Sequence, residues 1–300
     1  MKKALKWIGI GLGGIVAILV IGVLVVNLVG TRRLNKKYVV VVAPITIPTN
    51  AAAVARGEHL ATAVSGCNDC HQKDFSGQLF FDDPAIGQIY ATNLTDGTGG
   101  IGAAYTDEDW VRALAHGVAP DDRMLMLMPA QHFRHYSDVD LGAIIAYMKT
   151  IPPVDNEMPL PDFTFMGRTL FALNAFGQMP AEMIDHEGER PSAPPVGTTT
   201  TYGELLVTVG TCKDCHSENL AGSQPGPNKP WGPNLTMGGR MGSWTEADFV
   251  TVMRMGKTPD GRQLNEAMPW KFYGGMTDEE LQAIWLYLHQ TGTLASNEMK

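Results

Sequence analysis

Apolar residues are distributed along this chain in two ways, first as one unbroken segment and then at helical intervals. Residues 7–30 contain no charged side chain, and Asn27 is the one strongly polar residue among them. As a helix, the segment would be about 36 Å long, enough to cross a bilayer core of about 30 Å. Basic residues flank it on both sides, which disfavours a buried core helix. A cleaved signal peptide has a shorter apolar region and a small-residue cleavage site, so we expect residues 1–37 to form an uncleaved membrane signal-anchor.

The rest of the chain contains two copies of one module. The pentapeptide Cys67–His71 recurs as Cys212–His216, and the tripeptide Asn93–Thr95 recurs as Asn234–Thr236. Further matched positions follow in the same order: Thr106 and Thr245, Gly117 and Gly256, Met128-Pro129 and Met268-Pro269, Tyr147 and Tyr287. The repeat predicts the following organisation after the anchor: a first domain over residues 38–151, a Pro-rich linker over 152–197 and a second domain over 198–300.

Each copy has the pattern of a helical domain. At four matched places a Ser or Thr is followed three positions later by an acidic residue, the capping-box arrangement that starts a helix: Thr106, Ser137, Thr245 and Thr277. After the second start in each copy, apolar residues recur at helical spacing. Further helices are expected around residues 52–65 and 202–210, before each cysteine pair. The predicted fold class is therefore mainly α.

The segments between these helices predict loops and a linker. Residues 72–105 and 217–243 are rich in Gly, Asp and Thr, and no alternating pattern indicates an extended sheet. Within the linker, residues 163–179 are nearly uncharged but too few to cross a membrane. We favour a helix that packs against one or both domains, and the alternative is a segment that dips into the membrane surface.

Composition and charge narrow the class of partner. The chain has 300 residues, of which 44% are hydrophobic and 18% charged, which is typical of packed domains and not of a disordered chain. Seven of its 23 Lys and Arg lie in residues 1–37, which contain no acids, so the remainder holds 16 basic and 31 acidic side chains, a net charge of −15. Phosphate backbones repel a body this acidic, which argues against nucleic acid as a partner.

The cysteines occur only in the repeated Cys-x-x-Cys-His motif, the signal for covalent attachment of haem c. Two thiols one helical turn apart form thioethers with the two vinyl groups of the haem, and the following histidine then lies below the iron. The motif therefore predicts two covalently bound haem c groups. The attachment and proximal-ligand residues are Cys67, Cys70 and His71 for the first, and Cys212, Cys215 and His216 for the second.

Alternative roles for the four cysteines fit the sequence less well. A four-cysteine zinc site would not need a histidine after each pair, a thioredoxin-like pair needs a βαβ context, and disulfides would leave both histidines without a role. Haem c is attached on the outer side of the bacterial cytoplasmic membrane. The basic flanks of the anchor are too balanced to indicate its orientation. Because of where haem c is attached, we expect the N-terminus inside and both haem domains on the outer, periplasmic face.

The sixth iron ligand is predicted partly by elimination, because no cysteine remains for it. Met128 and Met268 each precede a proline at matched positions before the last helix of their module, and we predict them as the distal ligands. The predicted metal ligands are thus His71, Met128, His216 and Met268. Neighbouring residues that remain alternatives in the first domain are Met124, Met126, His132 and His135. Ligation by His and Met closes the iron and raises its reduction potential, as in an electron carrier.

Other polar residues give weaker indications of function. Asn93 and Asn234 match the N-x-T glycosylation pattern, but their equivalent placement favours a structural hydrogen bond in the haem loop. His59, His116 and His186 are expected to be ordinary helix or loop residues.

Taken together, these motifs resemble the membrane-anchored dihaem c-type cytochromes of bacterial respiratory chains. Each module resembles a class I cytochrome c domain, over residues 52–151 and 202–290. The resemblance implies an N-terminal transmembrane helix followed by two tandem class I cytochrome c domains. It also implies that the first and last helices of each domain cross at a glycine and an aromatic residue: Gly57 with Tyr147 and Gly203 with Tyr287. The cytochrome subunits of quinoprotein alcohol dehydrogenases share these motifs but usually carry three Cys-x-x-Cys-His, and this chain carries two.

The first hypothesis for function is electron transfer on the outer side of the membrane, without catalysis by the chain itself. Its redox partners would be a quinol-oxidising complex or a dehydrogenase on one side and a terminal oxidase on the other. The alternatives are a dihaem cytochrome c peroxidase-like enzyme, which needs a haem that can open a coordination site, and a haem subunit of a membrane dehydrogenase complex. A dihaem thiosulfate dehydrogenase would need a cysteine ligand, for which the chain has no candidate.

Overall fold

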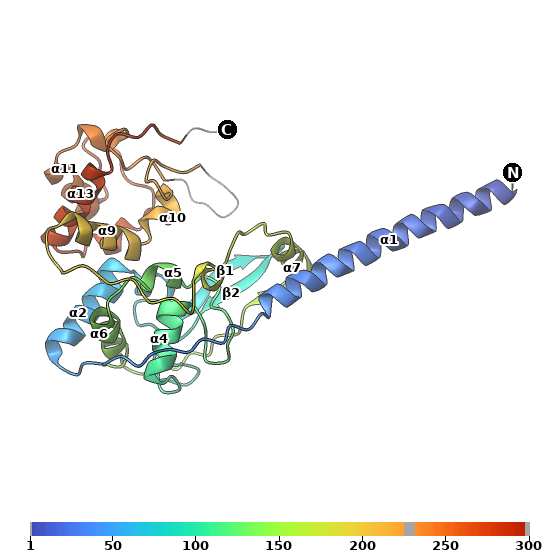
Figure 1. Cartoon of the computed structure of the whole chain (residues 1–300), viewed down its shortest axis with the longest axis horizontal. Coiled ribbons are helices and arrows are strands. Elements are labelled where there is room, and N and C mark those ends of the chain that lie inside the picture. Colours follow the sequence, from blue (N-terminus) through green and yellow to red (C-terminus); the bar gives the residue numbers. More distant parts are fainter. Residues whose placement is uncertain (1, 225–231, 298–300) are drawn as a thin grey trace.

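The computed structural model describes residues 2–224 and 232–297 of the chain. One long helix, α1 (Lys2–Leu34), projects from a body made of two helical modules and a small sheet (Figure 1). Side chains of residues 5–25 in α1 are exposed, and cover by the rest of the protein begins near Asn27. Among the described residues, α1 is the one helix long and apolar enough to cross a membrane. The predicted anchor segment is thus a continuous helix that fits a membrane span.

The first module packs its first helix across its last. Its helices are α2 (Ala51–His59), the π-helix η1 (Leu60–Val64), α3 (Cys67–Cys70), α4 (Asp107–His116), α5 (Ala130–Phe133) and α6 (Asp138–Met148). Helices α2 and α6 cross at Gly57, where a Cβ would overlap the carbonyl oxygen of Ala143. Tyr147, one turn further along α6, packs edge-on against Phe75 in the core. Only a residue without a side chain allows this close crossing.

The second module repeats this arrangement. Its helices are α9 (Thr200–Val209), α10 (Cys212–His216), the 3-10 helix η2 (Arg240–Ser243), α11 (Glu246–Met255), α12 (Trp270–Tyr273) and α13 (Asp278–Gln290). Helices α9 and α13 cross at Gly203, where a Cβ would overlap the carbonyl oxygen of Ala283 and lie 3.0 Å from the Cβ of Tyr287. The internal repeat of the sequence is therefore also a repeat of helix packing.

All four predicted helix starts are N-caps in the structure. Thr106, Thr245 and Thr277 form complete capping boxes with the acidic residue three positions later. Ser137 caps α6 without the reciprocal bond. The acidic residue at that helix start, Asp140, instead accepts a hydrogen bond of 3.2 Å from Arg56 of α2.

A small antiparallel sheet lies in a region for which the sequence predicts only loop, so that prediction is wrong there. Its strands are β1 (Gln78–Asp83), β2 (Gly87–Ala91) and β3 (Asp162–Phe163), in the order β1-β2-β3. The Asp83 carboxylate accepts from the backbone amides of Ala85 and Ile86 in the turn. Strand β3 comes from the linker, and a Cβ at Gly87 would overlap the carbonyl oxygen of Asp162. No side chain of β1 is buried, so its sequence has no alternation of apolar and polar positions to detect.

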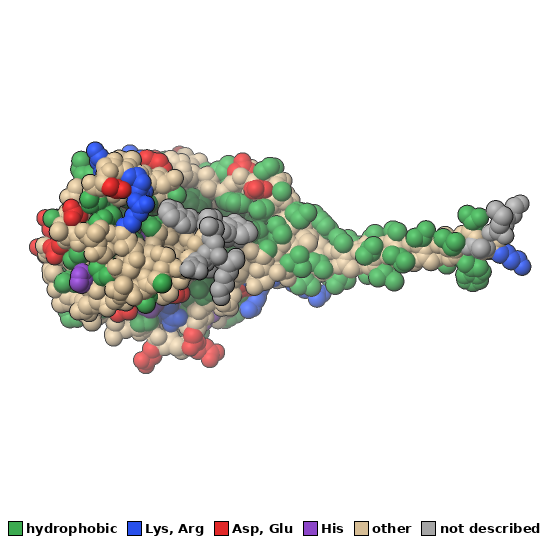
Figure 2. Space-filling view, turned by 90° about the horizontal axis from the view of Figure 1, so that it is seen from above, with side chains coloured by type: hydrophobic (Ala, Val, Ile, Leu, Met, Phe, Trp, Pro, Cys, Tyr) green, Lys and Arg blue, Asp and Glu red, His purple; other side chains and the backbone are tan. Residues whose placement is uncertain are grey.

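The linker forms two helices, α7 (Phe165–Ala172) and α8 (Pro180–Met183). Helix α7 packs along the C-terminal end of α1, and its Phe171 belongs to a hydrophobic core shared with the first module. The predicted helix in residues 163–179 is confirmed, and its partners include the anchor as well as the first module. Hydrophobic side chains run along α1 and continue where α1 meets the body (Figure 2).

The two modules share one hydrophobic core, to which Leu60 of η1 and Leu206 of α9 both belong. Polar contacts also join the two modules at Glu280 of α13, which is only 3% exposed. Its carboxylate accepts a hydrogen bond of 3.3 Å from Arg56 and lies 2.7 Å from the Nε2 of His59. His59 is thus an interface residue and not an ordinary helix position. His116 likewise stacks on His186 of the linker.

Candidate functional site

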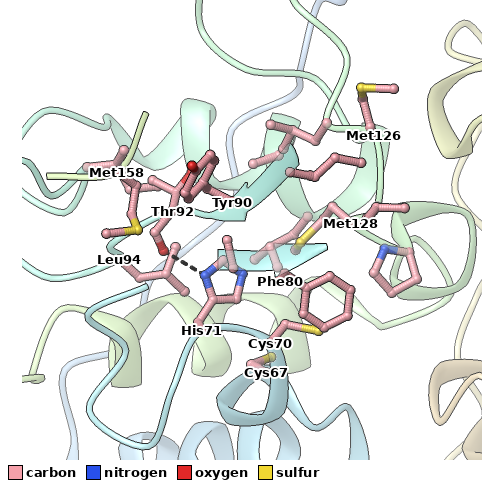
Figure 3. A pocket seen from close by; sticks show the side chains of 18 of the residues that line it. Cys67, Cys70, His71, Phe80, Tyr90, Thr92, Leu94, Met126, Met128 and Met158 are labelled. Carbon is pink, nitrogen blue, oxygen red and sulfur yellow. Dashed lines mark hydrogen bonds between the residues drawn. The ribbon is translucent and has the colours of Figure 1, made fainter. Parts of the chain in front are cut away.

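The first Cys-x-x-Cys-His motif opens onto a cavity of about 320 Å³ (Figure 3). Cys67, Cys70, His71 and Met128 all line it. The rest of the wall is largely apolar and comes from the sheet, α4, α5, α6 and the linker; it includes Phe80, Leu94, Trp110, Leu114, Phe133, Ile144 and Leu160. The structure therefore brings together the four residues that the sequence predicts for the first site.

The backbone before each cysteine pair places both thiols on one helical turn. Gly66 precedes Cys67 and Thr211 precedes Cys212, and both have left-handed backbone with φ of 58° and 56°. This conformation reverses the chain and starts a new short helix at the cysteine. It favours glycine, so a threonine there carries a conformational cost of about 1 kcal/mol or more. The same local geometry recurs at both motifs although the residue differs.

Each motif histidine is held by a backbone carbonyl. The Nδ1 of His71 donates to the carbonyl oxygen of Thr92 at 2.7 Å, and the Nδ1 of His216 donates to that of Pro233 at 2.7 Å. Burial lowers the pKa of both imidazoles, and the carbonyl bond only partly offsets this. A neutral imidazole with its proton fixed on Nδ1 has a free lone pair on Nε2, which is the arrangement of a metal-ligating histidine.

The four cysteines are unpaired, and their surroundings are apolar. Burial raises the pKa of Cys67 and of Cys212 to about 12, and that of Cys70 to about 11. Such thiols stay protonated at neutral pH, so they are not preorganised thiolate ligands. No group of three or more His, Cys, Asp or Glu that could hold a metal ion occurs in the described part of the chain.

The two predicted methionines occupy matched positions. Pro129 follows Met128 with φ −78° and ψ 54°, and Pro269 follows Met268 with φ −82° and ψ 50°; each proline caps a one-turn helix. Met268 is partly buried against the core. In Figure 3 the Met128 side chain extends into the pocket, whereas the Met126 thioether points away from the His71 ring.

A linker methionine that the sequence analysis did not single out also lines the first cavity. Met158 contributes to its wall, together with the two prolines that flank Leu160. The available signal was a further Met-Pro pair, Met158-Pro159, in the linker. Met124 and Met126 line the same cavity but are buried in the core shared with α7, which explains them as packing residues.

Asn93 and Asn234 are structural, as predicted. Asn93 is fully buried. Its side-chain oxygen accepts hydrogen bonds from the backbone amide and the hydroxyl of Thr95, and its side-chain nitrogen donates to the carbonyl oxygen of Val154 at 2.7 Å. Asn234 makes the same bonds to Thr236 and to a carbonyl beyond the last helix. Both asparagines tie the loop that holds the motif histidine to the end of the module, and burial makes glycosylation of the folded chain impossible at either.

Comparison with known proteins assigns the second module to a protein family. Residues 201–292 match the family model for cytochrome c. The chain is a c-type cytochrome. It is 29% identical over 285 residues to the fructose dehydrogenase cytochrome subunit of Gluconobacter japonicus, covering 84% of this chain and 56% of that one. It is 30% identical over 290 residues to the gluconate 2-dehydrogenase cytochrome c subunit of Pantoea cypripedii, covering 81% and 60%.

A third relative is close to this cytochrome in length. The diheme cytochrome c-type protein of Cereibacter sphaeroides is 27% identical over an alignment of 270 positions, which covers 78% of this chain and 84% of that protein. The chain covers less than two thirds of the two dehydrogenase subunits. The relatives are named as cytochrome subunits of dehydrogenases or as a diheme cytochrome.

The first cavity of the cytochrome fits covalent haem c. It offers two protonated thiols on one turn, an imidazole whose Nε2 is free, and apolar walls for the flat macrocycle. The second module has the same thiol pair and the same histidine–carbonyl bond. Gly232 lets its loop come close, since a Cβ there would lie 2.9 Å from the Nδ1 of His216.

The two motifs of the cytochrome lie beside each other across the interface between modules. A Cβ at Gly66 would lie 2.6 Å from the ring of Phe272, four residues after Met268. His132, four residues after Met128, has its Nε2 2.8 Å from the Oδ1 of Asp214, inside the second motif. Each Met-Pro segment is therefore followed by a short helix that contacts the cysteine motif of the other module, an arrangement with approximate two-fold symmetry.

Proposed function

We propose that the chain is a membrane-anchored dihaem cytochrome that passes electrons between a dehydrogenase and a respiratory acceptor. One haem c would be attached through Cys67 and Cys70, and a second through Cys212 and Cys215. The observation that carries this proposal is the repeated site: both motifs have the same turn, the same imidazole–carbonyl bond and the same buried asparagine loop. The two domains would span residues 38–151 and 198–300 and both belong to class I.

Axial ligation follows from the same repeat. His71 and His216 would ligate through Nε2, because the carbonyl bond orients each ring and keeps the proton on Nδ1. Met128 and Met268 would be the distal ligands, and their prolines hold the backbone of both segments in one conformation. Bound haem supplies a reversible one-electron couple. The chain contributes an apolar wall that excludes water and two neutral ligands, which favour a high potential.

The contact between the modules would carry electrons from one haem to the other. Phe272 lies against the turn that begins the first motif, and the His132–Asp214 contact lies within the turn of the second. Both contacts involve residues next to predicted ligands or attachment points. The shared core holds them at fixed separation, so transfer would not need a swinging linker.

Partners and orientation follow from the relatives and the anchor. Several relatives are named cytochrome subunits of fructose, gluconate or alcohol dehydrogenases, so the proposed donor is a dehydrogenase on the outer face of the membrane. A quinol-oxidising complex is the alternative donor, and a terminal oxidase is the proposed final acceptor. The N-terminus would lie inside and the haem body on the periplasmic face, where haem c is attached.

The test is the haem count and the reaction of the fully reduced, full-length protein with carbon monoxide. We expect two haems per chain and no spectral change with carbon monoxide, because both irons are closed by methionine. A sample unfolded in urea, in which the distal ligands are released, serves as the positive control. One haem per chain would overturn the dihaem assignment. A stoichiometric change in the folded protein would overturn the ligand assignment and favour a peroxidase-like enzyme.

A further inference from the structure

Helix α7 presents an apolar stripe to the outside. Met166, Leu170 and Leu173 recur at helical spacing, and Met166 and Leu173 are 53% and 65% exposed. Phe165, at the start of the helix, is 45% exposed. A neighbouring face, with Gly167 and Phe171, is buried against the sheet and the core. This is the pattern of a surface helix whose second face also has an apolar partner.

Three contacts with α1 determine where α7 lies along the length of the anchor helix. The side chain of Asn27 donates to the carbonyl oxygen of Phe165 at 2.8 Å, and the Nη1 of Arg33 donates to that of Phe171 at 2.8 Å. Between them, a Cβ at Gly30 would overlap the carbonyl oxygen of Arg168. The two helices therefore run side by side in the same direction, and the start of α7 is the end nearer the apolar span.

The exposed part of α1 has the length of a bilayer core. Residues 5–25 are all exposed, and as a helix they are about 31 Å long, against about 30 Å for the hydrocarbon layer. Asn27, where cover by α7 begins, then lies just outside that layer. Asn27, the polar interruption of the apolar segment, is thus explained as the residue that binds α7 at the membrane boundary.

The surroundings of this boundary suit lipid headgroups. Arg32 and Lys36 are exposed and follow Gly30 in the chain, so they lie further from the apolar span than Gly30 does. The Nε of Arg33 instead donates to Glu182 at 2.9 Å, and this pair ties the linker to the anchor. Exposed cations at headgroup depth attract anionic lipids.

We propose that the start of α7 is inserted into the outer interfacial layer of the lipid bilayer beside α1, as a second membrane contact. The proposal rests on α1 spanning the membrane, as in the proposed function. Phe165 and Met166 lie in the interface, and Leu173 lies at its aqueous edge. Strand β3 directly precedes α7 and pairs with β2. The residue that follows β2 is Thr92, whose carbonyl oxygen binds His71. The membrane contact is therefore connected through the sheet to the segment that holds His71. The contact thereby sets the orientation of the first site relative to the membrane.

The experiment measures the accessibility of a spin label on the full-length, haem-loaded protein in vesicles of phosphatidylcholine and phosphatidylglycerol. Met166→Cys carries the test label. Val139→Cys is the matched control, because Val139 is 76% exposed on α6 at the end of the body opposite α1 (Figure 1). Leu12→Cys, in the middle of the apolar span, is the bilayer reference. The native cysteines are blocked as thioethers, so the unsubstituted chain should take up no label.

We expect oxygen to relax the label at 166 more strongly than a water-soluble nickel chelate, with the order reversed at 139. A label at 166 that behaves like that at 139 would overturn the proposal. Exclusion of both reagents at 166 would also overturn it, because the stripe would then be covered by protein. Loss of the bilayer signature at Leu12→Cys would instead contradict the membrane span, and labelling of the unsubstituted chain would contradict haem attachment.

Discussion

Phe272 of the second module lies against Gly66 of the first, directly before Cys67 of the first motif. The backbone of Gly66 is left-handed, and a Cβ there would lie 2.6 Å from the aromatic ring. One glycine therefore serves two purposes, since it starts the cysteine turn and admits the neighbouring module. The contact makes the interface between modules part of the proposed first haem site.

Gly66→Ala should destabilise the protein by about 2–5 kcal/mol. About 1–2 kcal/mol comes from a side chain in left-handed backbone, and a further 1–3 kcal/mol comes from overpacking against Phe272. Thermal unfolding of the haem-loaded protein measures the loss. Gly177→Ala is the matched control, because Gly177 is also left-handed but has open space around it. Phe272→Ala should cost less stability in the Gly66→Ala background than in the unsubstituted protein, because it also relieves the overlap. Equal costs in the two backgrounds would mean that the ring is not the obstacle.

Glu280 should make the interface between modules sensitive to acid. Burial opposes its charged form, but hydrogen bonds from His59 and Thr277 and the charge of Arg56 outweigh it, so the pKa of Glu280 lies below its ordinary value of 4.5. As the pH falls, the unfolded chain takes up the proton first. The stabilisation is therefore complete above the unfolded pKa and is lost as the pH drops through the lower, folded pKa.

Denaturant unfolding between pH 7 and pH 3 checks this dependence. Glu280→Gln should lower the free energy of unfolding by about 2–3 kcal/mol at neutral pH, because it breaks a buried charged network. The same variant should show a smaller further loss on acidification than the unsubstituted protein. Glu279→Gln, at the exposed neighbouring position, should leave both quantities nearly unchanged. Equal acid sensitivity in all three proteins would contradict the role of Glu280.

Met128→Ala should open one of two haem irons. The reduced variant is expected to bind one equivalent of carbon monoxide per chain, because the distal position of the first haem loses its ligand while the second stays closed. Met126→Ala and Met158→Ala are matched controls, since both side chains line the same cavity. Both should leave carbon monoxide binding at zero. Binding in the Met158→Ala variant instead would transfer the distal role to the linker methionine.

Gly30→Val should detach α7 from the anchor. A Cβ at Gly30 would overlap the backbone of Arg168, so the two helices cannot keep their distance. We expect faster limited proteolysis within residues 163–179, because the linker loses its support on α1. Gly22→Val, in the same helix but with open space around it, should leave the cleavage rate unchanged. Equal cleavage in the two variants would show that the helix contact is not closely packed.

Local patterns along the sequence predicted most of this protein. The two Cys-x-x-Cys-His motifs, the four caps such as Thr106, and the apolar anchor each depend on residues within a few positions of one another, so their signals can be read locally. The buried role of Asn93 followed from its repetition in both modules, and its bonds bear that out.

Several contacts between distant segments were decided by the tertiary structure alone. Strand β3 joins β2 from across the first module, Met158 reaches the first cavity, Phe272 contacts Gly66, and α7 lies along α1. These contacts join residues that are far apart in the chain, and each depends on shape and burial at both partners at once. Neither partner alone carries a periodic or capping signal for the other, so their pairing becomes visible only when the chain is folded.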